Sequence, residues 1–291
     1  EKHQIKAFVD LDKFLNSDLD AVYIATPHDT HFLYSMACIR KNIHVLCEKP
    51  LTLNSSESMI LINAAIKKRV FLMEAFMYRC HPQTFKILEL VEKYFIGKRV
   101  TIKSSFGFTT DVSKEHRLRN PNLAGGAILD VGCYPLSMVR LISGKLNRMD
   151  FSDPIGISIE GELDETGVDA KSTAILNFTD EISAEIKTAI HEEYENNLII
   201  ESDDLCLEVS DPWHCGQFSE GESVIKFTNE GTEEKIEIND EVGLFTREID
   251  EAAKCIEQGR IESPKMTHRD SLGNMLWLEK WYTQLGVNFP S

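Results

Sequence analysis

The stretch AVYIATP, residues 21–27, is a continuous apolar run that ends at a proline, which is the pattern of a strand buried on both faces. Similar apolar runs follow at 42–47 and 70–75, and helical patterns lie between them at 30–41 and 54–68. Strands that alternate with helices of roughly ten to fifteen residues favour right-handed crossovers and a parallel sheet. The first 80 residues therefore predict an α/β domain with a parallel sheet.

The pattern changes after residue 80. A helix is predicted at 83–95, a half-exposed strand at 99–106, and a second helix from the glycine pair 125–126 to about residue 142. The strand-like runs that follow are separated by Gly, Asp and Asn turns, so they predict a mainly antiparallel sheet. They lie at 155–160, 171–178, 182–190, 197–201, 205–209, 223–227 and 235–238. Helices at 243–258 and 267–284 close the chain.

We therefore predict two domains, an N-terminal one at 1–80 and a C-terminal α/β one at 81–291, with the helix at 267–284 packing back on the first. A parallel sheet with crossover helices commonly binds a dinucleotide, and the pyrophosphate of that cofactor sits on a Gly-rich turn. The first glycine of the chain is Gly97, and no G-x-G occurs. Either an N-terminal strand–turn–helix unit precedes this sequence, or the sheet does not bind a dinucleotide in the usual way. The helical pattern at 14–20 leads into an interior strand and favours the first alternative, an N-terminally incomplete Rossmann-like sheet.

Acidic residues are concentrated in one region. The 291 residues contain 47 Asp and Glu against 31 Lys and Arg, a net charge of −16. Residues 151–240 contain 24 acids and 4 bases, a net charge of −20, which leaves +4 for the rest of the chain. We interpret this region as the solvated outer face of a sheet, and the alternative is a binding surface for a cationic partner. The overall charge argues against nucleic-acid and anionic-membrane partners.

The seven cysteines are scattered, and no C-x-x-C occurs. Neither a disulfide framework nor a zinc site is supported, so we expect no metal and a reducing, cytoplasmic location. No run approaches eighteen consecutive apolar residues and no signal-peptide pattern opens the chain, so we expect no membrane partner.

The first candidate for chemistry is Lys49, in Glu48-Lys49-Pro50. This triplet follows the carboxyl end of a predicted buried strand, where ligands bind in open α/β sheets. A lysine there can donate to a substrate hydroxyl or carbonyl and can lower the pKa of a neighbour. The alternative is a solvated charge pair at a strand end.

The second candidate is the stretch GGAILDVGCY, residues 125–134. On a helix, Asp130 and Tyr134 are four residues apart and lie on one face. Tyr134 could move a proton if a cation such as Lys49 lowers its pKa from near 10. The alternative is a buried tyrosine that hydrogen-bonds the helix carboxylate. Upstream, Arg117 and Asn120 are candidates for binding the hydroxyls of a substrate.

Four stretches in this order resemble the glucose–fructose oxidoreductase and inositol dehydrogenase family, Gfo/Idh/MocA. They are DAVYIATPH at 20–28 with His31, HVLCEKP at 44–50, GGAILDVGCY at 125–134, and the tail with ESP at 262–264 and DSLGNM at 270–275. Tyr134 stands where a histidine is common in the family, which resembles the dihydrodiol and xylose dehydrogenase branch.

The resemblance implies a Rossmann domain, a C-terminal α/β domain whose open sheet forms a homo-oligomer interface, and hydride transfer between NAD or NADP and a sugar or cyclic diol. By position, Lys49 would orient the reacting oxygen, Tyr134 would be the acid/base, and Asp130 would support the site. Other residues would flank the cofactor, with Lys49 also near it: Thr26, Pro27, His31, Glu48 and, near the nicotinamide end, Arg79.

The leading hypothesis is therefore an NAD(P)-dependent dehydrogenase of a sugar, polyol or cyclic diol. A non-catalytic ligand-binding or regulatory protein on the same scaffold is the alternative, because the Gly-rich turn does not occur in the sequence. A scaffold protein joined through its acidic sheet is a third possibility.

Overall fold

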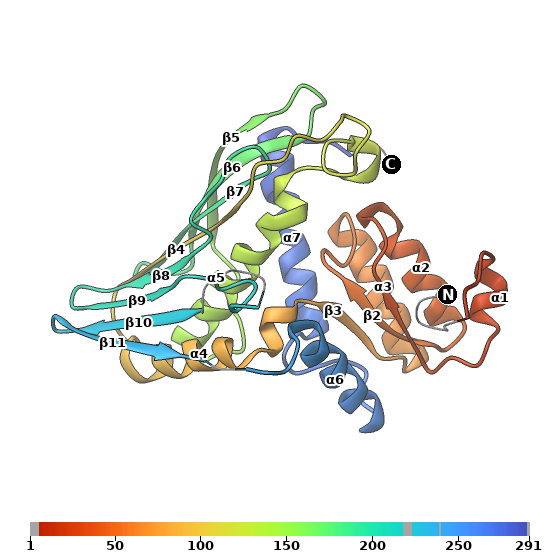
Figure 1. The fold of residues 1–291 in the computed structure, drawn as a ribbon, viewed down its shortest axis with the longest axis horizontal. Coiled ribbons are helices and arrows are strands. Elements are labelled where there is room, and N and C mark those ends of the chain that lie inside the picture. The colour runs from red at the N-terminus through yellow and green to blue at the C-terminus, as the bar shows by residue number, and fades with distance from the viewer. Residues whose placement is uncertain (1–5, 218–222, 239, 290–291) are drawn as a thin grey trace.

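The computed structural model describes residues 6–217, 223–238 and 240–289, which form two sheets separated by helices (Figure 1). The smaller sheet is parallel, in the order β1 (Ala21–Ile24), β2 (His44–Glu48), β3 (Leu72–Ala75). The helices α2 (His31–Arg40) and α3 (Ser55–Lys68) connect these strands, and the short α1 (Leu11–Leu15) precedes them. The side chain of Asn54 caps α3 by accepting from the backbone N–H of Glu57 at 2.9 Å. The predicted parallel α/β arrangement is confirmed.

The sequence predicts that β1 is buried on both faces, but among the described residues only Ile24 of this strand is buried, and Tyr23 is 41% exposed. Within the described residues β1 pairs with β2 alone. An apolar run reports a preference for burial but not the presence of a neighbour, so it does not distinguish an edge strand from an interior one.

The larger sheet has eight strands in the order β11-β10-β9-β8-β4-β7-β6-β5. All neighbouring pairs are antiparallel except β4 with β7, which confirms the prediction of a mainly antiparallel sheet. The strands are β4 (Val100–Gly107), β5 (Gly156–Leu163), β6 (Asp169–Asn177), β7 (Ile182–Ala189), β8 (Leu198–Glu201), β9 (Leu205–Val209), β10 (Val224–Asn229) and β11 (Thr232–Glu237).

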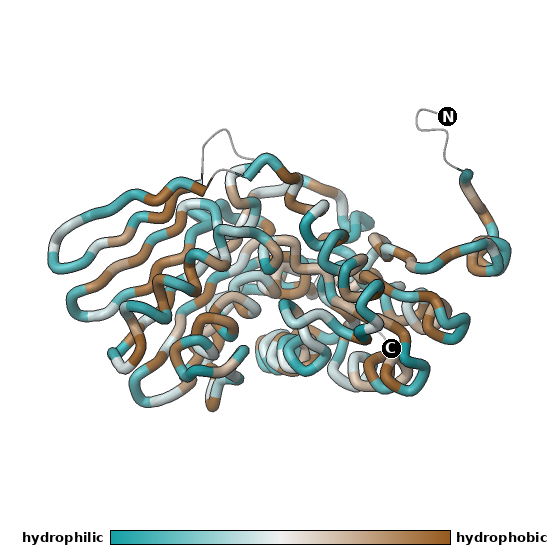
Figure 2. The backbone as a smooth tube through the Cα atoms, turned by 90° about the horizontal axis from the view of Figure 1, so that it is seen from below, coloured by the Kyte–Doolittle hydropathy of each residue, from teal (hydrophilic) through white to brown (hydrophobic). Residues whose placement is uncertain are grey.

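The acidic region forms the outer face of this sheet. Along the strands hydrophobic and hydrophilic residues alternate (Figure 2), so one face packs inward and the other faces water. On the outer face Lys103 pairs with Glu201 at 2.6 Å, and Lys187 with Glu185 at 2.9 Å. The acidic strand residues therefore lie on the outward-facing side of the sheet, as predicted.

Helices fill the space between the two sheets (Figure 1). The helix α4 (Pro82–Tyr94) packs on α5 (Cys133–Leu146), which lies against the inner face of the large sheet. The stretch Pro121–Leu146 is long and apolar enough to cross a membrane by composition, but 94% of its most apolar window is buried inside the protein. Its apolarity is therefore accounted for by the core.

The last two helices are α6 (Leu244–Glu257) and α7 (His268–Leu285). As expected from the sequence, α7 contacts the N-terminal part of the chain: Glu279 accepts from the backbone N–H of Ser55 at 2.9 Å, and the Tyr282 hydroxyl donates to the Leu53 carbonyl at 3.1 Å. The small sheet is thereby held against the rest of the molecule.

Candidate active site

A cleft of about 300 Å³ lies at the carboxyl ends of β1 and β2. This is the position where open α/β sheets bind ligands. It is lined by Ala25, Thr26, Pro27, His28, His31, Glu48, Lys49, Arg117 and Asp130. Most of the residues that the sequence indicated for the site are therefore brought together, from segments far apart in the chain.

Two turns form one wall of the cleft. The segment after β1 carries Thr26, and β2 ends at Glu48, followed by Lys49 and Pro50. The buried imidazole of His31 joins these turns, with its Nδ1 2.7 Å from the Pro50 carbonyl oxygen and its Nε2 2.9 Å from that of Thr26. His31 therefore acts on the shape of the wall that presents Lys49.

Asp130 enters the cleft from a five-residue π-helical turn, Ile128–Gly132, that precedes α5. Gly126 lies two residues before this turn, and its φ of +116° is a conformation that favours glycine. A Cβ atom at Gly126 would lie 2.1 Å from Oδ1 of the buried Asp169, whose Oδ2 accepts from the Ile128 N–H at 2.6 Å. Gly126 is therefore required by the close approach of Asp169, and Gly125 by the backbone carbonyl oxygens of residues 117 and 118, each 2.6 Å from where its Cβ would lie.

The Asp130 carboxylate lies between two cations, Lys49 and Arg117, and the imidazole of His28. The Asp130 Oδ1 lies 2.7 Å from Arg117 Nη1, 3.7 Å from His28 Nε2 and 3.8 Å from Lys49 Nζ. Burial lowers the pKa of His28 to about 3, so this imidazole is neutral at neutral pH, and Lys49 and Arg117 are the charges that act on Asp130. Burial acts to raise the pKa of Asp130, but Lys49 and Arg117 together outweigh it, so the pKa is lowered below its ordinary value. Asp130 is therefore a carboxylate at neutral pH.

Lys49 is held in a fixed place by the same turn. Its Nζ donates to the Asp130 backbone carbonyl at 2.5 Å and lies 5.0 Å from the centroid of the Tyr134 ring. Its side chain is only 12% exposed, so the ammonium sits at the inner end of the cleft rather than in bulk water. The alternative of a solvated charge pair is thus wrong for Lys49.

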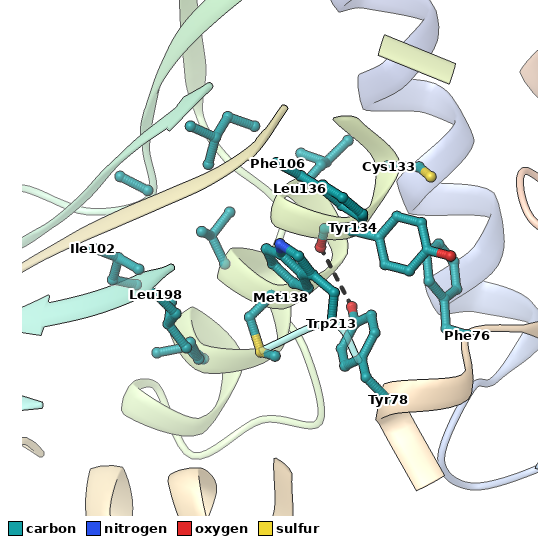
Figure 3. Packing of buried hydrophobic residues seen from close by; sticks show 14 of the residues in the cluster. Phe76, Tyr78, Ile102, Phe106, Cys133, Tyr134, Leu136, Met138, Leu198 and Trp213 are labelled. Carbon is teal, nitrogen blue, oxygen red and sulfur yellow. Dashed lines mark hydrogen bonds between the residues drawn. The ribbon is translucent and has the colours of Figure 1, made fainter. Parts of the chain in front are cut away.

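Tyr134 is buried among aromatic rings (Figure 3), with the Lys49 ammonium over its ring. The rings of Phe106, Phe76, Trp213 and Tyr78 have centroids 5.2, 5.7, 5.9 and 6.0 Å from its own. The Tyr134 hydroxyl donates to Sδ of Met77 at 3.5 Å. Reasoning from the sequence missed these rings, because they come from separate segments that only the fold unites.

Two expectations for Tyr134 are wrong. Burial raises the pKa of its hydroxyl well above 10, so Lys49 does not lower that pKa; the ammonium lies over the ring face. Tyr134 also makes no hydrogen bond with Asp130, because the π-helical turn directs the carboxylate to Arg117 and Lys49 while the hydroxyl contacts Met77. The spacing of four residues assumed a regular α-helix, which begins only at Cys133.

Three predicted residues are not among those that line the cleft: Tyr134, whose ring lies under the Lys49 ammonium, and Arg79 and Asn120. Arg79 is buried in the turn Met77–Cys80 after β3, where Nη2 pairs with Asp270, and it lines a different cavity. The expected contact of Arg79 with the cofactor does not fit this position. Asn120 uses its side chain to cap the short turn Pro121–Leu123, accepting from the Asn122 N–H at 3.0 Å. Its sequence position indicated proximity to Arg117, but its side chain has a local structural partner.

Glu48 has two neighbours that reasoning from the sequence missed, the half-exposed Tyr23 and the buried Glu248. The hydroxyl of Tyr23 donates to Glu48 Oε1. Glu248 on α6 is fully buried, and its two carboxyl oxygens have no hydrogen-bond partner among the residues that the structure describes. Burial and the charge of Glu48 raise the pKa of Glu248 to about 9. One signal existed: Leu244, Glu248, Ala252 and Cys255 share the buried face of a helix, and Glu248 is its acidic member.

We expect Glu248→Gln to stabilise the protein, and increasingly so as the pH rises. With a folded pKa of about 9 against an ordinary 4.5, the folded state binds a proton that the unfolded state has lost. Stability therefore falls between these pH values, by up to about 3 kcal/mol at pH 7. Glutamine has no such proton uptake, so the gap between variant and parent should widen from pH 5 to pH 8.5 in urea unfolding.

The matched control is Glu257→Gln, at the exposed end of the same helix, which should leave stability unchanged at each pH. A stability gap for Glu248→Gln that does not vary with pH would show that this carboxyl does not take up a proton on folding.

Comparisons with known proteins agree with this architecture. Residues 1–76 match the model of an oxidoreductase family with an NAD-binding Rossmann fold, and residues 85–209 match the GFO/IDH/MocA C-terminal domain. A trans-1,2-dihydrobenzene-1,2-diol dehydrogenase of Xenopus laevis is 30% identical over 274 residues, covering 94% of this chain and 80% of the relative. An NADP⁺-dependent D-xylose 1-dehydrogenase of Haloferax volcanii is 28% identical over 267 residues, covering 92% and 78%.

Among solved structures, an aldose–aldose oxidoreductase from Caulobacter crescentus superposes with a TM-score of 0.81 at 23% identity, covering 94% of this chain and 79% of that one. The fold and the cleft define a two-domain oxidoreductase of the Rossmann type. The chain belongs to the GFO/IDH/MocA family, in which its relatives are sugar and diol dehydrogenases. It is an NAD(P)-dependent enzyme that transfers a hydride to or from a sugar or diol, rather than a non-catalytic binding protein.

The residues of the cleft fit one end of this cofactor. Thr26, Glu48 and Lys49 supply hydrogen-bonding groups at the carboxyl ends of parallel strands. A second cavity, of about 320 Å³ along the edge of β1, shares Ala25 and Thr26 with the cleft, so the space continues along the sheet. Residues 1–96 contain no glycine, so the turn that holds a pyrophosphate in this fold class is not among them.

Proposed function

We propose that the enzyme interconverts a secondary alcohol and a carbonyl on a ring-shaped diol or sugar, with Lys49 and Tyr134 acting on the reacting oxygen. The observation that carries this proposal is the placement of the Lys49 ammonium, which lies between the Asp130 turn and the Tyr134 ring at the end of the cleft. The similarity to diol and xylose dehydrogenases supports it.

The residues divide the work as follows. Lys49 donates to the oxygen of the reacting carbon and orients it, and Asp130 is a positioning residue that holds Lys49. Tyr134 transfers the proton at that oxygen. Thr26, Pro27, His31 and Glu48 flank the cofactor, and Arg117 binds a substrate hydroxyl at the mouth of the cleft. Bound NAD(P) supplies or accepts the hydride.

The raised pKa of Tyr134 favours one direction at neutral pH. A phenol that keeps its proton is suited to protonate the oxygen of a carbonyl under reduction. Oxidation of the alcohol requires the ionised phenol, which becomes more populated as the pH rises. We therefore expect reduction of the carbonyl to be favoured at neutral pH and oxidation of the alcohol to be faster at alkaline pH.

The aromatic surroundings of Tyr134 support a ring-shaped substrate, because the C–H face of a ring packs on aromatic side chains. We expect kcat/KM for trans-1,2-cyclohexanediol or D-xylose to exceed that for glycerol by at least about tenfold. The assay follows NADH or NADPH absorbance with each cofactor in turn, which also decides the cofactor preference. Equal rates with glycerol would contradict the preference for rings, and no hydride transfer with any of these alcohols would contradict the proposed substrate class.

We also propose that the protein is a homodimer joined through the outer face of its large sheet. No described helix covers this face, and Ile175 on β6, the strand next to the sheet's β5 edge, is 46% exposed. We expect light scattering to give the mass of two chains and Ile175→Arg to shift it toward one. A parent protein that is monomeric at about 10 μM would rule this interface out.

A cytoplasmic location remains part of the proposal. The seven cysteines are all free thiols, and six of them are buried, which suits a reducing compartment. Fractionation of cells tests this location, and recovery in a secreted fraction would contradict it.

A further inference from the structure

A third cavity, of about 220 Å³, is the one lined by Arg79; it lies away from the cleft and shares no residue with it. It is formed between α4 and α5, next to the loop at 264–265. Its walls include Phe85, Leu88 and Leu141, its rim carries Lys145 and Lys265, and the buried Arg79 lines it from within. Apolar walls with a few charged groups are the usual composition of a small-molecule site.

Among the residues that line this cavity Arg79 is unusual, because it is a charged side chain that is only 2% exposed. Its Nη2 pairs with Asp270, but its Nε and Nη1 have no hydrogen-bond partner among the described residues. Buried guanidinium groups normally find acceptors for their N–H groups, since an unmet buried donor is costly. Arg79 therefore keeps two donors for which the described residues supply no acceptor.

Arg140 provides a comparison within the same network. It is fully buried and also pairs with Asp270, through Nη1 at 2.6 Å. Its Nε and Nη2 both donate to Asp153, at 3.0 and 2.7 Å. Every nitrogen of the Arg140 guanidinium is thus satisfied by the protein, so the shortfall at Arg79 is specific to the arginine that lines a cavity.

The two rim lysines can add donors. Lys145 pairs with Glu92, which is 60% exposed, and such surface pairs contribute little. Lys265 pairs with Glu251 at 3.1 Å, and its Nζ also lies 5.0 Å from the centroid of the Phe85 ring. Each ammonium has three N–H groups, so both keep donors for a ligand. Asp150 is the one acidic residue among those that line the cavity.

We propose that this cavity is a second binding site, for a small carboxylic acid with an apolar body, whose carboxylate is held by Arg79 and the rim lysines while the body packs on Phe85, Leu88 and Leu141. The site is next to the active centre in the chain, because Arg79 follows Met77 and Tyr78, which both contact Tyr134.

Benzoate is the probe that tests the proposal, by isothermal titration calorimetry of the enzyme. We expect binding in the millimolar range, as for other ligands of this size. Benzamide has the same ring without the charge and formate has the charge without the ring, so both should bind at least about fivefold more weakly. The double variant Lys145→Gln/Lys265→Gln should weaken benzoate by about tenfold.

The matched control is Lys86→Gln/Lys93→Gln, which removes the same charge from α4 at positions outside the cavity. It should leave benzoate affinity within about twofold of the parent, and so should Lys49→Ala, because Lys49 belongs to the other cleft. The proposal is overturned if benzoate does not bind at 20 mM (roughly twenty times the expected Kd), if benzamide binds equally well, or if the control pair or Lys49→Ala weakens binding as much as the rim variant.

Discussion

Replacing Tyr134 by phenylalanine is expected to lower kcat by about 10²–10⁴, the usual contribution of a positioned acid or base. Folding should be nearly unaffected, because the hydroxyl donates only to the Met77 sulfur and the ring keeps its aromatic neighbours. Its removal should therefore change the free energy of unfolding by less than about 1 kcal/mol. Steady-state kinetics and urea unfolding of the same preparation separate the two effects.

The pH profile provides a second measure of the same residue. Since the pKa of Tyr134 is raised well above 10, the ionised fraction at lower pH should rise tenfold with each pH unit. The rate of alcohol oxidation by the parent should follow it up to about pH 10, and the residual rate of the phenylalanine variant should not. Tyr282→Phe is the control, since Tyr282 is also buried but its hydroxyl donates to the Leu53 carbonyl. Equal losses in both variants would contradict a chemical role for Tyr134.

Replacing Lys49 by alanine is expected to lower kcat/KM by about 10²–10³, because the donor that orients the reacting oxygen is lost. The change also removes from Asp130 its strongest charge partner, so the pKa of that carboxyl should rise. Arg117 remains 2.7 Å from Asp130, so the carboxylate keeps a partner and the fold should persist. Kinetics in both directions, with thermal unfolding alongside, measure these effects.

Lys41→Ala is the control for lost positive charge, because Lys41 is exposed at the end of α2 and donates to Asn16 at 2.8 Å. It should leave kcat/KM within about twofold. If Lys49→Ala left the rate unchanged with every accepted substrate, the proposed role of Lys49 would be wrong.

Local patterns predicted the elements well. The helix α3 (Ser55–Lys68) matches the helical pattern predicted at 54–68, and the strands of the large sheet lie within a few residues of the predicted runs. These features depend on residues close together in the chain, through helix capping, apolar periodicity and turn residues. The same reasoning found Lys49 and Asp130, since both follow a recognisable boundary, a strand end and a glycine pair.

Reasoning from the sequence did not find the residues that surround the site. Tyr134 was expected to have a lowered pKa, but four aromatic rings from distant segments desolvate it and raise that pKa. Glu248 lies 200 positions from Glu48 in the sequence, yet the two interact electrostatically because α6 packs on β2. Burial of a side chain depends on which elements meet, and no local pattern contains that information.

By itself, the sequence determined the two kinds of sheet, the acidic outer face and the residues at the ends of the parallel strands, because each follows from periodicity or from charge along the chain. Only the tertiary structure decided that Asp130 turns to Lys49 and Arg117, and that Arg79 pairs with Asp270 beside a separate cavity. The physical reason is that electrostatic and hydrogen-bond partners are chosen by distance in space, and the docking of the two sheets sets those distances.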